Sequence, residues 1–224
     1  AFSIGHKGYC GLGIGGGVQQ DLWEYDPITN AWTQKAPFPG GGRTDAIAFV
    51  VSGKAYVGTG RDGASVDKKD IWRYDPTNNT WTQRASLGGV IRRNAVAFSI
   101  GNFGYLGTGQ SGTTLLNDFW RYDPNADQWT QRASYPGSAR FIATGFALNG
   151  LGYLGTGQAA GNALKKDMYA FNPANNTWTA RADFGGTARN SAVGFNIGSF
   201  GYMGTGLASN GRQQDVWRYD AGIN

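Results

Sequence analysis

Four arginines recur at nearly constant spacing, and they are the residues of this sequence best suited to bind an anion. They are Arg43, Arg92, Arg140 and Arg189, separated by 49, 48 and 49 residues. A guanidinium can hold a carboxylate, sulfate or phosphate through two parallel hydrogen bonds. This column is therefore a candidate ligand site. The candidate set also includes polar residues that follow the arginines, namely Asp45, Arg93, Asn94 and Asn190.

A column of aspartates has the same period and offers a second interpretation. Its members are Asp21, Asp70, Asp118, Asp167 and Asp215. One arginine and one aspartate in each repeat could form ion pairs that hold the repeats together. Charge clusters can be structural as well as functional, and a residue that recurs in every repeat is more often part of the scaffold. The arginine column is therefore either a ligand site or a set of structural ion pairs.

Histidine and cysteine are too rare for most catalytic and metal chemistry. His6 is the only histidine and Cys10 the only cysteine. Sites with several histidines and intrachain disulfides are therefore excluded. We expect Cys10, which lies in a strand-like run, to be a small buried apolar residue. No catalytic residue, metal site or cofactor is predicted.

Composition limits the class of partner and the localisation. The net charge is +5, but no run of basic residues is longer than two, so nucleic acid is not favoured as a partner. No segment approaches the roughly 20 apolar residues of a membrane-spanning helix. The 37 glycines and the single glutamate, Glu24, argue against helices. This composition is typical of an exported bacterial protein, so we expect a secreted or cell-surface location.

An internal repeat positions all these residues. The segment Asp21-Leu-Trp-Glu-Tyr-Asp26 returns at Asp70, Asp118, Asp167 and Asp215, in steps of 49, 48, 49 and 48 residues. Each repeat offers four short runs rich in aromatic and β-branched residues, with turn residues between them, which predicts strands. A column of small residues in the first run, Ala46, Ala95, Ala143 and Ala192, suits strands that converge on a crowded axis. We predict one all-β domain over residues 1–224, with repeats at about 1–42, 43–91, 92–139, 140–188 and 189–224.

The repeated motifs resemble the kelch repeat over the whole chain. They are an aromatic residue before Gly-x-Gly, then Asp-x-Trp-x-Tyr-Asp-Pro, then Asn-x-Trp or Asn-x-x-Trp, although Gly-Thr-Gly stands where kelch repeats usually have adjacent glycines. The resemblance implies a β-propeller of four-stranded antiparallel blades with strand one innermost. It places the start of strand one and the loop between strands two and three on one face, where the arginines would surround a channel.

The last of the five repeats stops before its outer strand. The chain is therefore either a five-bladed ring short of one strand or a piece of a longer protein. A galactose-oxidase-like copper site is excluded, because it needs two histidines.

We predict that the protein is a recognition module, not an enzyme, and that it binds a protein or an acidic glycan at the arginine-bearing face. Some bacterial kelch propellers interconvert the anomers of sialic acid, so an enzyme acting on an acidic sugar is one alternative. It would need an acid or base near the arginines; Asp45 is better placed than Glu24, which we expect to face away from the channel. A structural component, with its open blade edge paired with another chain or a second copy, is the other alternative.

Overall fold

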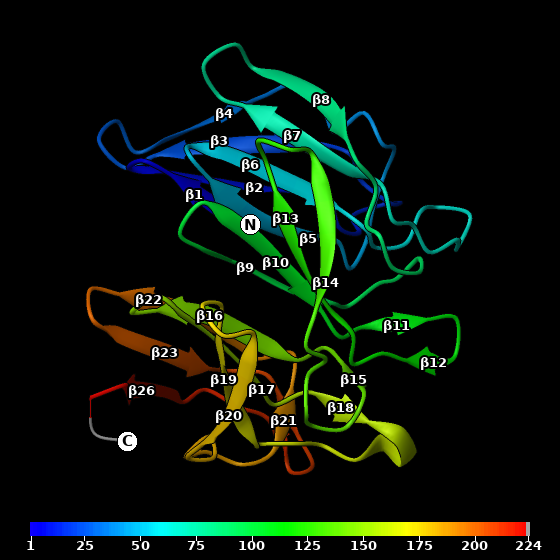
Figure 1. Ribbon diagram of the computed structural model, residues 1–224. Coiled ribbons are helices and arrows are strands. Elements are labelled where there is room, and N and C mark those ends of the chain that lie inside the picture. Colours follow the sequence, from blue (N-terminus) through cyan, green and yellow to red (C-terminus); the bar gives the residue numbers. More distant parts are fainter. Residues whose placement is uncertain (223–224) are drawn as a thin grey trace.

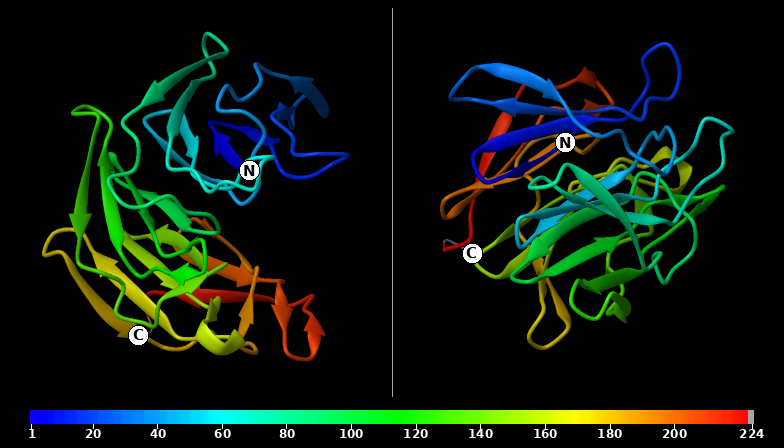
Figure 2. Two further views of the ribbon diagram at one scale, coloured as in Figure 1. Left: turned by 90° about the vertical axis from the view of Figure 1, so that its right-hand side faces the viewer. Right: turned by 90° about the horizontal axis from the view of Figure 1, so that it is seen from above.

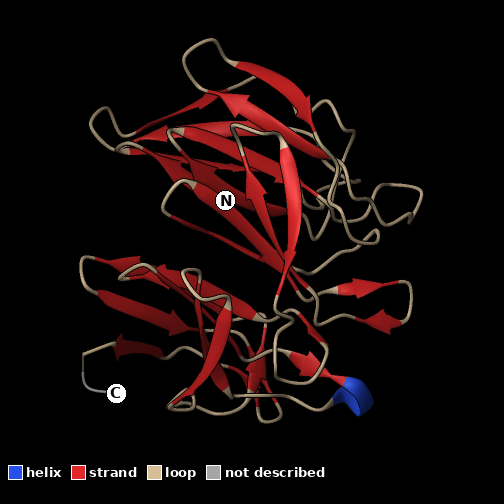
Figure 3. Cartoon of the chain, in the orientation of Figure 1, coloured by secondary structure: helices blue, strands red, loops and turns tan. Residues whose placement is uncertain are grey.

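The chain forms five antiparallel β-sheets that are arranged as the blades of a propeller. The structure, a computed structural model, describes residues 1–222. Strands alternate with short turns throughout, and the only helix in this part of the chain is a single 3₁₀ turn, η1 (Ala160–Asn162) (Figure 3). No helix among the described residues is long and apolar enough to cross a membrane.

Four blades have four strands each and the fifth has three, as the sequence repeat predicts. Blade 1 contains β1 (Phe2–Ile4), β2 (Lys7–Gly11), β3 (Leu22–Asp26) and β4 (Ala31–Gln34). Blade 2 contains β5 (Ile47–Val51), β6 (Lys54–Gly58), β7 (Ile71–Asp75) and β8 (Thr80–Arg84). Blade 3 contains β9 (Val96–Ile100), β10 (Phe103–Gly107), β13 (Phe119–Asp123) and β14 (Gln128–Arg132). Blade 4 contains β16 (Thr144–Leu148), β17 (Leu151–Gly155), β19 (Met168–Asn172) and β20 (Thr177–Arg181), and blade 5 contains β22 (Val193–Ile197), β23 (Phe200–Gly204) and β26 (Val216–Asp220).

The loops on one face contain short strands, and this face is the right-hand side of Figure 1. They are β11 (Gln110–Ser111), β12 (Thr114–Leu115), β15 (Arg140–Phe141), β18 (Gln158–Ala159), β21 (Arg189–Asn190), β24 (Leu207–Ala208) and β25 (Gly211–Arg212). We call this side the loop face. It carries the segments that precede each first strand and the loops between second and third strands, as the kelch resemblance implies.

The first strand of each blade lies innermost. A hollow of about 230 Å³ on the axis is lined by residues of all five repeats, including Ala46, Ala95, Ala143 and Ala192. The prediction of small residues at a crowded axis is therefore confirmed. Seen toward the loop face, the blades follow an arc from blade 1 to blade 5 (Figure 2, left).

Neighbouring blades interlock through a phenylalanine of one blade and a glycine of the next. Phe49 of β5 lies over Gly104 of β10, where an added Cβ would come within 2.1 Å of the ring. Phe98 and Phe146 contact Gly152 and Gly201 in the same way. Glycine is required at these positions because any side chain would push two sheets apart.

The two end blades each have one uncovered face. Phe195 of blade 5 is 42 % exposed, whereas Phe49, Phe98 and Phe146 are at most 6 % exposed. Cys10 is exposed, so the prediction that it is buried is wrong. It lies on the face of blade 1 that corresponds to the buried Leu106 of blade 3, and no described blade packs against that face.

Candidate recognition surface on the loop face

Each repeated arginine is buried beside the aspartate that precedes the third strand of its own blade. In blade 3, Nη1 and Nη2 of Arg92 both lie 2.6 Å from the carboxylate oxygens of Asp118. The equivalent pairs are Arg43–Asp70, Arg140–Asp167 and Arg189–Asp215. We call each pair an Arg–Asp brace. The arginines therefore form ion pairs, but each brace joins two segments of one blade and does not link neighbouring blades.

In blades 4 and 5 the brace and its neighbouring loop occupy all the hydrogen-bond donors of the arginine, whereas Nε of Arg43 in blade 2 has no hydrogen-bond partner. Arg140 donates from Nε to the Ser138 carbonyl, from Nη1 to the Thr156 carbonyl and Asp167, and from Nη2 to Ser138 Oγ and Asp167. A guanidinium has five N–H donors, so none is left for a ligand. Arg189 is saturated in the same way.

The threonine of each Gly-Thr-Gly segment completes the brace. Thr59, Thr108, Thr156 and Thr205 have φ between 55° and 60°, a left-handed conformation that is unusual for β-branched residues. This conformation directs the threonine carbonyl at the arginine, as in the 2.9 Å bond from Arg43 Nη1 to the Thr59 oxygen. The departure from adjacent glycines in the sequence thus belongs to the scaffold.

The arginines also lower the pKa of the aspartates. Hydrogen bonds from Arg189 lower the pKa of Asp215 to about 2, against the opposing effect of burial. Burial alone would raise the pKa of Asp70 and Asp118, but hydrogen bonds from their arginines outweigh it and lower both values. All three carboxylates are therefore ionised at neutral pH.

A chain of backbone hydrogen bonds surrounds the channel mouth at the residues two positions after the arginines. The amide of Asn94 donates to the Asp45 carbonyl at 3.1 Å, Ile142 donates to Asn94 at 3.1 Å, and Ser191 donates to Ile142 at 3.2 Å. All four residues have φ between 51° and 56°. The predicted site residues Asp45 and Asn94 are thus brought together on neighbouring blades.

In blades 2 to 5, one pair of facing positions differs from blade to blade. The residue after each arginine pairs across strands with a residue of the loop between strands two and three. The pairs are Thr44 with Arg61, Arg93 with Gln110, Phe141 with Gln158 and Asn190 with Leu207. We call these eight residues the variable pairs. Their side chains differ in charge, polarity and size from blade to blade, whereas the neighbouring Arg–Asp brace is the same in each.

Two arginines of the variable pairs converge on one buried carboxylate. Asp67 accepts hydrogen bonds from Arg61 Nε at 2.8 Å and from Arg93 Nη1 at 2.8 and 2.9 Å. Burial would raise the pKa of Asp67, but these bonds and the Gly112 amide lower it. The cluster carries one excess positive charge, and the side chain of Arg61 is 32 % exposed.

Asn190, the last candidate from the sequence, lies at a different part of the loop face. Its Nδ2 donates to Oε1 of Gln158 at 2.8 Å, and Gln158 in turn donates to Asn162 at 2.8 Å. Asn190 is buried, so its own side chain is held within this amide network. The candidates therefore divide into an Asp45–Arg93–Asn94 group, an Asn190 group and the four braces.

The candidate residues predicted from the sequence do not include Arg61, Asp67, Gln110 or Gln158. The sequence does show that the loops between strands two and three, such as 61–69 and 158–166, differ among repeats, which makes them a place for specificity. That signal marks a segment but does not say which side chains face the arginine-bearing strand. Glu24 lies away from the channel as predicted, where it accepts hydrogen bonds from Lys7 at 2.8 Å and Tyr9 at 2.5 Å.

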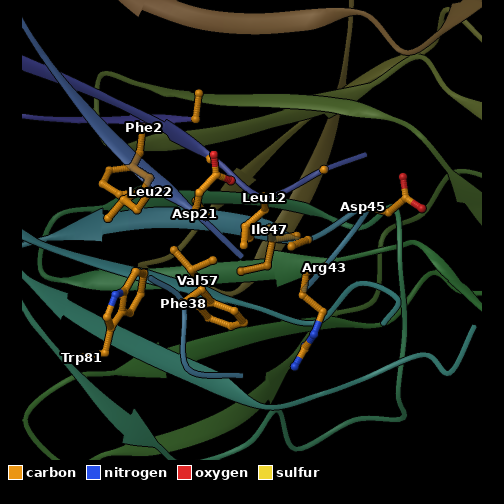
Figure 4. Close-up of a pocket in the computed structure, with 15 residues that line it drawn as sticks. Phe2, Leu12, Asp21, Leu22, Phe38, Arg43, Asp45, Ile47, Val57 and Trp81 are labelled. Atoms are coloured by element: carbon orange, nitrogen blue, oxygen red, sulfur yellow. The ribbon is translucent and has the colours of Figure 1, made fainter. Parts of the chain in front are cut away.

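A separate cavity of about 190 Å³ lies between blades 1 and 2 (Figure 4). Its lining is mainly apolar and includes Leu22, Ile47 and Trp81. Asp45 lies apart from this apolar group in Figure 4, and its carboxylate points away from it. Across residues 1–222, no group of three or more histidine, cysteine, aspartate or glutamate side chains could hold a metal ion.

Radial four-stranded blades with a repeated aromatic and glycine pattern define a β-propeller. The Kelch motif model matches residues 44–88 and 109–134, so these two stretches are kelch motifs, as the sequence resemblance predicts.

Comparison with solved structures agrees with this class. The fold is similar to that of YjhT, with a TM-score of 0.82 over 100 % of this chain and 81 % of the other. Sequence identity is 16 %, so this likeness concerns the fold. No curated protein matches the sequence.

Proposed function

We propose that this protein is a non-catalytic recognition module that binds a protein or a glycan through the variable pairs of the loop face. The observation that carries the proposal is the contrast between repeated and variable residues. Every arginine of the column is buried in a brace, whereas the adjacent positions differ from blade to blade. Variable loops on a rigid repeated frame are where recognition residues are usually found.

The chemistry of the surface favours a ligand that has both anionic and neutral polar groups. The Arg61–Asp67–Arg93 cluster offers partly exposed guanidinium groups with excess positive charge. Gln110, which pairs with Arg93, and Gln158, which pairs with Phe141, provide amide donors and acceptors, and Phe141 provides a ring. Acidic glycans and acidic peptide segments both present this combination.

The proposal is tested with a panel of acidic sugars, neutral sugars and anionic peptides, using thermal stabilisation followed by calorimetric titration. The test variant is Gln110→Ala/Phe141→Ala, which changes variable pairs without touching a brace. The matched control is Thr130→Ala/Gln131→Ala, two exposed residues on the outer strand β14. We expect a ligand whose affinity falls at least tenfold in the test variant and stays within twofold in the control.

Equal loss of affinity in both variants, or no ligand in the panel, would count against recognition at the variable pairs. Anomer exchange of an acidic sugar, followed by NMR, separates the enzyme alternative from binding. Exchange catalysed by the wild-type chain and lost in Asp45→Asn would replace the recognition proposal with catalysis. Asparagine tolerates the left-handed φ of 56° at this position, so Asp45→Asn keeps the backbone.

A further inference from the structure

Two arginines lie together on the face of blade 3 that packs on blade 4. Arg121 is directly opposite Tyr105 across β10 and β13, and Arg132 is opposite Phe119 across β13 and β14. The rings of Tyr105 and Phe119 contact Phe171 of blade 4, with centroids 5.7 and 4.9 Å apart, so this face is the one at the junction. Diagonal neighbours on one face of a sheet are within reach of long side chains. The two guanidinium groups are therefore neighbours at the junction of blades 3 and 4.

These two positive charges have no counter-ion in the chain. Neither Arg121 nor Arg132 forms an ion pair with a carboxylate among residues 1–222, and Nε of each is buried without a hydrogen-bond partner. Asp123 lies on the same face of β13, but it accepts two amides of the following turn, at 2.9 and 3.3 Å. Burial raises the pKa of Tyr105, and the charges of both arginines oppose that rise. Both guanidinium groups therefore act on the same small region beside the tyrosine.

The equivalent region at the junction of blades 1 and 2 contains a carboxylate. Glu24 has the place in blade 1 that Arg121 has in blade 3, because it is directly opposite the tyrosine of the second strand. It accepts hydrogen bonds from Tyr9 at 2.5 Å and Lys7 at 2.8 Å, and Nζ of Lys35 lies 3.4 Å away. The cations of this junction are therefore paired within the chain.

The junction of blades 2 and 3 has the same arginine pair, and here the next blade supplies a carboxylate. Arg73 and Arg84 correspond to the pair of blade 3 in the sequence repeat. Oδ2 of Asp127 lies 3.9 Å from Nη1 of Arg84. Burial would raise the pKa of Asp127, but hydrogen bonds from Tyr122 and the Ala85 amide, with the charges of Arg84 and Arg73, lower it. This carboxylate therefore lies in the field of both arginines.

At the junction of blades 3 and 4 an amide replaces that carboxylate. Asn176 has the position of Asp127, and its Oδ1 accepts the Ala133 amide at 3.0 Å, as Oδ1 of Asp127 accepts the equivalent amide. The remaining atom of the group is Nδ2, which is a donor, where Asp127 carries the oxygen that faces Arg84. The arginine pair of blade 3 and this amide are all partly exposed. They therefore present N–H donors to one another with no acceptor between them.

We propose that the junction of blades 3 and 4 binds one oxyanion, a carboxylate, sulfate or phosphate group, between Arg121, Arg132 and Asn176. The anion supplies the acceptors that Glu24 and Asp127 supply at the two preceding junctions. Guanidinium groups bind such anions through paired, charge-assisted hydrogen bonds, and the anion also relieves the repulsion between two like charges. The site uses no residue of the loop face, so it stands independently of the proposed function.

The test is thermal unfolding of the 224-residue chain at constant ionic strength, with chloride replaced stepwise by sulfate, phosphate or acetate. We expect a saturable rise in Tm, because an ion that binds only the folded state stabilises it. A response to acetate points to the carboxylate of an acidic side chain, and a response to sulfate or phosphate alone points to a free ion. Arg132→Gln should weaken the apparent affinity about tenfold, whereas Arg84→Gln, the same change in blade 2, should leave it unchanged. Equal Tm values in all four anions, or equal effects of the two variants, overturn the proposal.

A reciprocal exchange between the two junctions tests the position of the site. Asn176→Asp supplies an internal carboxylate, so it should raise Tm in chloride and abolish the response to the oxyanion. Asp127→Asn removes the carboxylate of the preceding junction and should add a second response of the same kind. The fold accepts both residues at this place, since Asn79 accepts the Ala36 amide and the Tyr74 hydroxyl, each at 2.9 Å, as Asp127 accepts its own pair. An oxyanion response that is the same in the wild type and both variants overturns the proposal.

Discussion

At the scale of single residues, the braces depend on complete pairing of a buried charge. Arg92 is fully buried and its carboxylate partner is Asp118. Removing one partner of a buried ion pair costs about 3–5 kcal/mol, because the other charge stays buried without compensation. We therefore expect Asp118→Ala to lower the free energy of unfolding by about 3 kcal/mol, measured by urea denaturation.

Asp21 supplies the matched control for this prediction. It accepts the indole N–H of Trp23 at 2.8 Å, as Asp118 accepts that of Trp120 at 2.7 Å, but no arginine among the described residues pairs with it. Asp21→Ala should therefore change stability by less than about 1 kcal/mol. Similar losses in the two variants would show that the ion pair contributes little and that the indole bond dominates.

The braces also make stability depend on pH in the acid range. The pKa values of Asp70, Asp118 and Asp215 are lowered in the folded state, to about 2 for Asp215. A lowered folded-state pKa contributes stability that is complete above the unfolded value of about 4 and is lost as pH falls through the folded value. Urea denaturation should give a steep fall in unfolding free energy between about pH 4 and pH 2. A flat profile across this window would contradict the assignment.

The sequence predicted the brace partners but left two interpretations of them open. A shared period places one arginine and one aspartate in every blade, which both a ligand site and an ion pair require. The choice depends on where the donors of Arg140 point, including two bonds to Ser138. Such contacts arise from loop conformation, which the repeat pattern does not encode.

At the scale of elements, a residue in the left-handed region lies two positions before the first strand of blades 2 to 5. The position is occupied by Asp45, Asn94, Ile142 and Ser191. Asparagine, aspartate and glycine adopt this conformation more readily than a β-branched residue, and the left-handed conformation costs roughly 1–2 kcal/mol for most residues. The backbone hydrogen bonds of Ile142 to Asn94 and Ser191 do not need its side chain.

Exchanging residue types between blades 3 and 4 tests this strain. We expect Ile142→Asn to raise the free energy of unfolding by about 1 kcal/mol and Asn94→Ile to lower it by at least as much. Thermal and urea denaturation of both variants would measure the changes. A loss of stability in Ile142→Asn would mean that packing of the isoleucine side chain outweighs its backbone strain.

The regular strands could be predicted because their apolar and turn residues recur, whereas the short loop strands could not. β15 and β21 lie where the repeated pattern gives way to Phe141 and Asn190, so no periodicity marks them. For the same reason, the cross-strand partners within the variable pairs could not be predicted. The variable residues and the predictable strands thus occupy different segments of each blade.

At the scale of the whole molecule, stability is shared between neighbouring blades because each blade packs only on the next. In repeat architectures, stability is approximately a sum of unit and nearest-neighbour interface contributions. Blades 2, 3 and 4 have a neighbour on both sides, and blades 1 and 5 have one uncovered face each. The prediction that Cys10 is buried was wrong for this reason, because the sequence around Cys10 resembles that of a strand covered by a neighbouring blade.

A matched pair of phenylalanines measures what one blade interface contributes. Phe98 and Phe195 occupy the same position of blades 3 and 5, and each stacks on the tyrosine of its own second strand. Phe98 also packs on Gly152 of the next blade and is 6 % exposed, whereas Phe195 is 42 % exposed.

Truncating a buried phenylalanine costs about 3–5 kcal/mol, so Phe98→Ala should destabilise the chain by about that amount and Phe195→Ala by about 1 kcal/mol. Because both variants lose the same stacking contact, the difference in their urea midpoints reports the interface. Equal losses would mean that the phenylalanines stabilise their own blades and not the junctions between blades.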